Sequence, residues 1–277
     1  MKNERRHMIT ERYPIIAIVF WFIMAIVTSN MFTPVFRAMG LFSDLPDRDA
    51  PSYVSSVIGA ILFLVIMKLW YAPKYKGILK PAVSWRQVLL ACMPLIIYSL
   101  FVLVFTLIQF DFYFNGSILF LLMALAAGFS EEIMFRASII PISMGFFKTE
   151  KRAWLVPVFS GAFFGIIHLA NIFSGATILN TIIQSTVNFF TGFYYGSLLV
   201  VTGSIVPDIV LHALYDYICF TTDRSLAGGV MVSELATFDI ILNLILAVGL
   251  AAGIAFILKK TGAEKILKIW KDKWSQE

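Results

Sequence analysis

The chain has 277 residues, of which 59% are hydrophobic and 14% are charged, and its net charge is +5. A soluble chain would carry about a quarter charged residues, so this composition and the mean hydropathy of +0.84 exclude an ordinary soluble domain and indicate an integral membrane protein. The basic residues lie at the ends of apolar runs, which is typical of membrane topology and gives no support for a nucleic-acid partner.

The start of the chain and the two cysteines give further information about this membrane protein. The basic leader, residues 1–13, contains His7, a solvated surface residue, and runs into an apolar segment without a small-residue cleavage site. It therefore predicts an uncleaved first membrane span. Cys92 and Cys219 both lie within apolar segments and have no metal-site spacing, so no disulfide framework is indicated.

Eight apolar runs predict an all-α, polytopic membrane bundle of about eight transmembrane helices, with any active site inside the bundle. The fourth run is too long for a straight crossing, and we expect Pro141 and Gly145 to kink it or to turn its end along the interface. The single membrane domain divides into helices one to three (1–116), a catalytic core (117–221), and the last span with a basic cytoplasmic tail (222–277). The runs are roughly 14–32, 53–71, 88–110, 117–147, 154–170, 178–201, 204–221 and 239–258.

Lysine and arginine residues are distributed unevenly between the two sides of the predicted bundle. Seventeen lie on the side of the N-terminus and three on the opposite side. By the positive-inside rule, both termini are expected in the cytoplasm. The seventeen are Lys2, Arg5, Arg6, Arg12, Lys74, Lys76, Lys80, Arg86, Lys148, Lys151, Arg152, Lys259, Lys260, Lys265, Lys268, Lys271 and Lys273; the three are Arg37, Arg48 and Arg224.

The tail, residues 261–277, is too polar to span a membrane. It can form an apolar side with Ile266, Leu267, Ile269, Trp270 and Trp274, opposite its lysines. We expect it to lie on the inner membrane surface, attracted by anionic lipid. A solvated basic tail is the alternative.

Two adjacent carboxylates and an arginine stand out inside the fourth apolar run, where each charged side chain is costly. Glu132 and Arg136 are four residues apart on one helical face, so they can neutralise each other, and alone they could be a structural ion pair. Glu131 points about 100° away from Glu132 around the helix and has no partner within that helix.

Two histidines also lie in predicted spans, His168 in the fifth and His212 in the seventh. Asp216 is one turn after His212, so it could orient the imidazole or pair with its charge. Asp208 is one turn before His212 on the same side of the helix and could help to hold the site residues in place. We expect it instead to cap the start of the seventh helix, because it follows a proline there.

Three spans thus deliver polar side chains to the interior of one bundle, and the chemistry open to them is limited. Glu131, His168 and His212 are the ligand types of a catalytic site for Zn²⁺ or another divalent metal with one position open for water. Without metal, Glu131 can act as general base on a water while the histidines stabilise an oxyanion. Either route is hydrolysis by an activated water. Nucleophilic catalysis by cysteine is less well supported, because no motif ties Cys92 or Cys219 to a histidine.

The order Glu-Glu-x-x-x-Arg, Phe-x-x-x-His and His-x-x-x-Asp, each on its own helix, resembles the CPBP family of intramembrane proteases (CAAX proteases and bacteriocin-processing enzymes, also called Abi). The resemblance covers residues 119–220. It implies that Glu131 activates the water, that Glu132 and Arg136 hold the site together, and that His168 and His212 bind a metal or polarise the scissile carbonyl.

Asp216 stands at the Asn/Asp position of the third motif, where prenyl-protein members of that family typically have Asn. The additional negative charge fits a bound cation or an imidazolium, which argues against a eukaryotic-type prenyl-protein substrate.

The expected function is therefore that of an intramembrane endopeptidase in a bacterial cytoplasmic membrane, of metalloprotease type if a metal is bound and otherwise with a metal-free glutamate mechanism. It would cleave a membrane-associated peptide or membrane-anchored protein, and the family suggests peptide, pheromone or bacteriocin processing, or immunity. A non-catalytic scaffold that binds a partner protein is the first alternative. An ion-coupled transporter is the second, and the lack of an internal repeat disfavours it. The expected partners are the lipid bilayer and the substrate, and the sequence does not indicate an oligomeric state.

Overall fold

The computed structural model describes residues 12–42, 45, 47–71, 75–147, 149–224, 226–227, 230–231 and 237–274. Within these ranges the chain is helical apart from its loops and a two-residue hairpin, in which β1 (Leu226–Ala227) pairs antiparallel with β2 (Val230–Met231). The predicted all-α membrane bundle is thereby confirmed. Outside these ranges lie six residues that enter the predictions from the sequence, namely Lys2, Arg5, Arg6, His7, Lys74 and Lys148.

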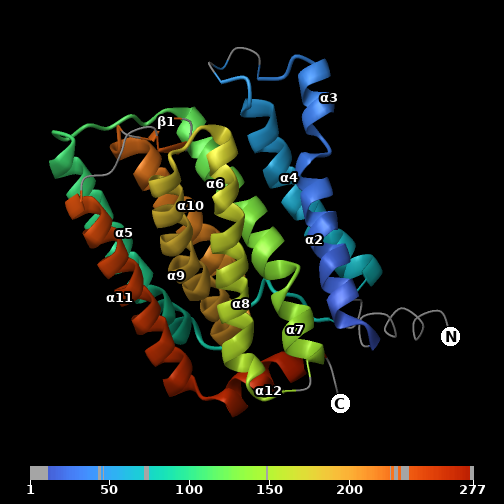
Figure 1. The fold of residues 1–277 in the computed structure, drawn as a ribbon. Coiled ribbons are helices and arrows are strands. Elements are labelled where there is room, and N and C mark those ends of the chain that lie inside the picture. Colours follow the sequence, from blue (N-terminus) through green and yellow to red (C-terminus); the bar gives the residue numbers. More distant parts are fainter. Residues whose placement is uncertain are drawn as a thin grey trace.

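Each of the eight predicted spans corresponds to one helix or to consecutive helical segments. The helices pack side by side in a bundle (Figure 1). Six segments of the described chain are long and apolar enough to cross a membrane. The protein is therefore a multi-pass membrane protein, and the count of eight remains a prediction, because α9 and α10 are not among the six. The helices are α2 (Pro14–Asn30), α3 (Thr33–Ala38), α4 (Ala50–Ile66), η1 (Met67–Tyr71), α5 (Trp85–Gln109), α6 (Ile118–Glu132), η2 (Ile133–Ala137), α7 (Ile140–Phe146), α8 (Arg152–Ile167), η3 (His168–Ser174), α9 (Ile178–Thr202), α10 (Val206–Thr222), α11 (Thr237–Thr261) and α12 (Ala263–Lys273).

Helix α9 lies inside the bundle, and α8 packs directly against it. Every residue from Thr191 to Thr202 is buried, so this half of α9 contacts protein on all sides. Glycines allow the close approach of α8. A Cβ atom on Gly161 would lie 2.6 Å from the backbone nitrogen of Phe193, and one on Gly165 would lie 2.6 Å from the carbonyl of Ser185. Small residues spaced by four are a common helix–helix contact in membranes.

Helices α6 and α10 also meet at a glycine. A Cβ atom on Gly128 would lie 2.9 Å from both the backbone nitrogen of Ala213 and the carbonyl oxygen of Ile209. The two backbones are therefore in contact one turn before the Glu131–Glu132 pair. This contact brings the carboxylates of α6 within reach of the polar residues of α10.

The long fourth run is broken, as its proline predicts. Helix α6 continues into the π-helix η2, and a short turn separates η2 from α7. Pro141 has no backbone N–H, and its ring would clash with the carbonyl of Ala137 in a continuous helix, which accounts for the break between these residues. Gly145 has a different role. It lies within α7, and a Cβ atom there would be 2.4 Å from Nε1 of Trp274.

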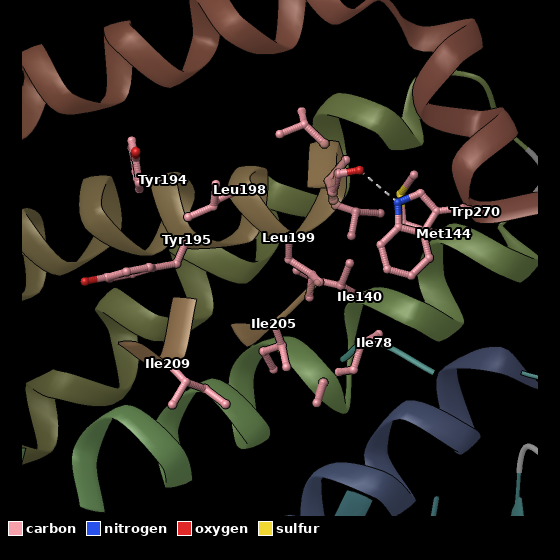
Figure 2. Close-up of a cluster of buried hydrophobic side chains, with 14 of the residues drawn as sticks. Ile78, Ile140, Met144, Tyr194, Tyr195, Leu198, Leu199, Ile205, Ile209 and Trp270 are labelled. Atoms are coloured by element: carbon pink, nitrogen blue, oxygen red, sulfur yellow. Dashed lines mark hydrogen bonds between the residues drawn. The ribbon is translucent and has the colours of Figure 1, made fainter. Parts of the chain in front are cut away.

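Helix α12 crosses one end of the bundle, the same end at which α2 begins (Figure 1). Its apolar side packs against α7, α8 and α9 and not against lipid. The indole Nε1 of Trp270 donates to the carbonyl of Val200 at 3.0 Å, and that of Trp274 donates to the carbonyl of Pro141 at 2.8 Å. Figure 2 shows Trp270 in the buried cluster that also contains Met144. The tail thus follows the predicted pattern except at Lys273, which is buried and donates from Nζ to the carbonyls of Gly77 and Lys80.

Candidate functional site

The predicted ion pair between Glu132 and Arg136 is present at the junction of α6 and η2. Oε1 of Glu132 lies 3.2 Å from Nη1 of Arg136, and both side chains are fully buried. Aromatic rings complete the surroundings of the guanidinium, whose Cζ lies 4.3 Å from the ring centroid of Phe164 and 5.3 Å from that of Tyr195. Such cation–π contacts help to offset the cost of burying the charge.

The same oxygen of Glu132 holds His212 from across the helix interface. Nδ1 of His212 lies 2.7 Å from Oε1 of Glu132. An ionised carboxylate can only accept a hydrogen bond, so Nδ1 of His212 carries the proton and is the donor. Tyr195 stacks on a face of the imidazole of His212, with ring centroids 5.0 Å apart and an interplanar angle of 17°. Glu132, and not Asp216, is therefore the residue that orients the ring.

The opposite nitrogen of His212 faces two further carboxylates. Nε2 lies 3.7 Å from Oε2 of Glu131 and 3.6 Å from Oδ2 of Asp216, which is within ion-pair range but longer than a hydrogen bond. The side chain of Glu131 is 27% exposed and that of Asp216 is 19% exposed, compared with 7% for His212. Glu131 therefore has a partner on a neighbouring helix, and it is the most accessible carboxylate of the cluster.

His168 is not in direct contact with this group. It is the first residue of η3, and its Nδ1 lies 2.7 Å from the carbonyl oxygen of Phe164, to which it donates. The ring of Phe164 meets His168 edge-on at 4.7 Å between centroids and His212 at 6.0 Å. The two histidines thus share one phenyl ring as a neighbour. Within the described residues His168 forms no ion pair with a carboxylate.

Two functional neighbours were missed by reasoning from the sequence. Phe164 is the first residue of the Phe-x-x-x-His motif, and it contacts Arg136, His168 and His212. The motif contained this signal, although no role was assigned to the phenylalanine. Tyr195 gave no signal, because nothing in the sequence of α9 marks it as a neighbour of His212.

The buried aspartate at the start of α10 differs from the expectation. Helix α10 begins after Ile205 without a side-chain cap, so the predicted capping role of Asp208 is wrong. Asp208 is fully buried, and neither of its carboxylate oxygens has a hydrogen-bond partner among the described residues. It lies within electrostatic range of Glu132 and Arg136.

The expected metal ligands do not converge in this arrangement. In the described part of the chain, no three His, Cys, Asp or Glu residues lie close enough together to hold a metal ion. Nδ1 of His212 is engaged by Glu132, and Nδ1 of His168 by the carbonyl of Phe164. The set of Glu131, His168 and His212 as ligands of Zn²⁺ or another divalent metal remains a prediction from the sequence.

Apolar helices around a buried cluster of carboxylates, arginine and histidine define an integral membrane protein with a polar site inside its bundle. Residues 113–218 of this chain match the family described as type II CAAX prenyl endopeptidase Rce1-like. The matched segment runs from the loop before α6 into α10, and it contains all six predicted site residues. This match agrees with the resemblance to the CPBP proteases that the three motifs predict, and it covers the segment that carries those motifs. No curated protein and no solved structure matches the chain.

Proposed function

We propose that this chain is an intramembrane endopeptidase that hydrolyses a peptide bond with a water activated by Glu131. The observation that carries the proposal is the approach of Glu131 and Asp216 to one nitrogen of His212, whose other nitrogen is held by Glu132. A partly exposed carboxylate next to an oriented imidazole is a common arrangement for general acid–base catalysis. The family match gives endopeptidase activity as the reaction class.

In the proposed reaction the carboxylate of Glu131 takes a proton from a water, and the resulting hydroxide adds to the scissile carbonyl carbon. Nε2–H of a protonated His212 donates to the oxyanion, and the ring's positive charge is stabilised by Glu132 and Asp216. When the intermediate collapses, the proton held by Glu131 passes to the leaving amine. The peptide bond is thereby replaced by a carboxylic acid and an amine, without a covalent enzyme intermediate.

The other residues would act by position. Glu132 keeps the imidazole in one orientation, and Arg136 compensates the charge of Glu132, as the 2.7 Å and 3.2 Å contacts to one oxygen suggest. His168 and His212 both contact the ring of Phe164, and Nε2 of His168 is left for a substrate because Nδ1 donates to a carbonyl. In this tautomer Nε2 accepts, so we assign it to a backbone N–H of the substrate beside the cleaved bond.

The proposed substrate is a membrane-associated peptide or membrane-anchored protein. The site lies among helices that are long and apolar enough to span a bilayer, so a substrate that is already in the membrane reaches it most directly. The negative charge of Asp216, where prenyl-protein members typically have Asn, argues against a eukaryotic-type prenyl-protein substrate. We infer a role in the processing of peptides, pheromones or bacteriocins, or in immunity to bacteriocins. The protein would act in a bacterial cytoplasmic membrane with both termini in the cytoplasm.

The test is complementation in the native host with Glu131→Gln, His168→Ala and His212→Ala, with Glu264→Gln on the exposed side of α12 as the matched control. Membrane levels are checked by immunoblot, and secreted and lipid-attached peptides are compared by mass spectrometry. We expect one precursor to persist uncut in all three site variants and to be processed in the control. Normal processing in the site variants would contradict the proposal and favour a scaffold that binds a partner protein.

A further inference from the structure

A cavity of about 220 Å³ lies against α12, which crosses one end of the bundle (Figure 1), and none of its lining residues belongs to the Glu131 cluster. Its lining comes from three helices, α7, α8 and α12. The lining residues are Met144, Gly145, Arg152, Leu267, Lys268 and Lys271. Its volume corresponds to several water molecules at about 30 Å³ each, which is enough for a small polar headgroup.

All three ionisable residues that line this cavity are cationic. The guanidinium of Arg152 is fixed at the wall, because Nε donates to the carbonyl of Met144 at 3.1 Å and Nη1 donates to that of Thr149 at 3.0 Å. These bonds leave Nη2 of Arg152 without a hydrogen bond in the described part of the chain. Three cationic side chains therefore line one cavity, and that of Arg152 is held in a fixed orientation.

The neighbouring carboxylates do not neutralise the cavity. Lys268 pairs with Asp272 at 2.9 Å, but both side chains are mostly exposed, and such a pair is weak. Glu150 lies near Arg152 and is not part of the lining. Lys271 forms no ion pair among the described residues. The cavity thus keeps a positive potential that would attract an anion.

We propose that this cavity binds the phosphate of an anionic phospholipid headgroup. Arg152 begins one candidate membrane span, and Met144 and Gly145 end another, so the cavity lies at the level where headgroups meet the helices. Met144 and Leu267 add an apolar wall for the glycerol and the first acyl carbons. Basic pockets between helices at the cytoplasmic side of membrane proteins favour such headgroups. The inference does not depend on the proposed peptidase activity.

The test uses the full chain purified in detergent, with lipid binding followed by native mass spectrometry. Phosphatidylglycerol is titrated into the wild type and into Lys271→Gln and Arg152→Gln. Each lost charge should weaken binding about fivefold. Lys151→Gln is the matched control, because it removes the same charge next to Arg152 but outside the cavity, and we expect a change below about twofold. Lys271 makes no side-chain hydrogen bond in the described structure, so this variant carries the test if Arg152→Gln folds poorly.

Two further titrations distinguish the source of the phosphate. Phosphatidylcholine has the phosphate but no net charge, and we expect it to bind more weakly and with equal strength to wild type and variants. Inorganic phosphate at millimolar concentration should not displace phosphatidylglycerol, because it lacks the apolar contact. The inference would be overturned if phosphatidylglycerol bound the variants as it binds the wild type, or if inorganic phosphate displaced it.

Discussion

Nδ1 of His212 donates a hydrogen bond of 2.7 Å to Oε1 of Glu132, and this bond joins α10 to α6 across 80 residues of sequence. The same oxygen lies 3.2 Å from Nη1 of Arg136. One carboxylate oxygen therefore both orients the imidazole and balances the buried guanidinium. The neighbouring Glu131 approaches the other side of the ring and is partly exposed. We therefore expect the two adjacent glutamates to have separable roles.

Replacing each glutamate with glutamine should separate these roles. Glu132→Gln leaves Arg136 buried without its counter-charge, and removing one partner of a buried pair typically costs about 3–5 kcal/mol. We therefore expect this variant to lose both thermal stability and activity. Glu131→Gln removes a partly exposed carboxylate, so its unfolding temperature should be near that of the wild type, while peptide cleavage should fall roughly 10²–10⁴-fold. Thermal unfolding in detergent and a cleavage assay measure the two effects. Equal loss of stability in both variants would contradict this division.

The stacked ring of Tyr195 is predicted to position His212 through its face and not through its hydroxyl. The centroids are 5.0 Å apart, and the ring also lies 5.3 Å from Cζ of Arg136. Tyr195→Phe keeps both contacts and should retain activity. Tyr195→Leu loses an aromatic pair worth about 0.5–1.5 kcal/mol, so we expect activity to fall by up to roughly tenfold. A Phe variant as impaired as the Leu variant would show that the hydroxyl itself takes part.

The contact between α6 and α10 at Gly128 should be necessary for the site. A Cβ atom there would lie 2.9 Å from backbone atoms of Ile209 and Ala213, so Gly128→Ala must push the helices apart. Because Glu132 is one turn further along α6, we expect the Glu132–His212 bond to lengthen and activity to drop. Gly249→Ala in α11 is the matched control, since no atom lies within 4 Å of its Cβ position. Alanine is the better helix former, so the control should be at least as stable as the wild type. Equal activity in both variants would contradict the prediction.

The parts of the site that sequence could predict are those that lie within one helix. The spacing of Glu132 and Arg136 gave their ion pair, and the apolar runs gave the helices that carry the three motifs. The contact between Glu132 and His212 depends on how α6 and α10 pack, and no spacing within either helix encodes it. The same limit applies to Tyr195, whose place beside His212 follows from the packing of α9.

A similar limit explains why the expectation for Asp208 differed from the structure. A proline before Asp208 suggested a helix cap, but α10 packs so closely that the carboxylate is buried. The set of metal ligands stays a prediction, and the structure adds that His168 and His212 both contact the ring of Phe164. Residue type and order identify which side chains enter the bundle, and the packed aromatic rings decide which of them touch.

The buried carboxylate of Asp208 gives the last prediction. Both of its oxygens lack a hydrogen-bond partner in the described structure, and it lies within electrostatic range of one carboxylate, Glu132, and one cation, Arg136. Burying a polar group without a hydrogen-bond partner is costly, and burying it as a charge costs far more. Asp208→Asn keeps the shape and prevents the charged form. We therefore expect an unfolding temperature equal to that of the wild type or higher, by about 2–4 °C for each kcal/mol gained. Thermal unfolding in detergent measures it, with Asp272→Asn at the exposed end of α12 as the control. A marked decrease, comparable to that of Glu132→Gln, would show instead that Arg136 requires both carboxylates as counter-charges.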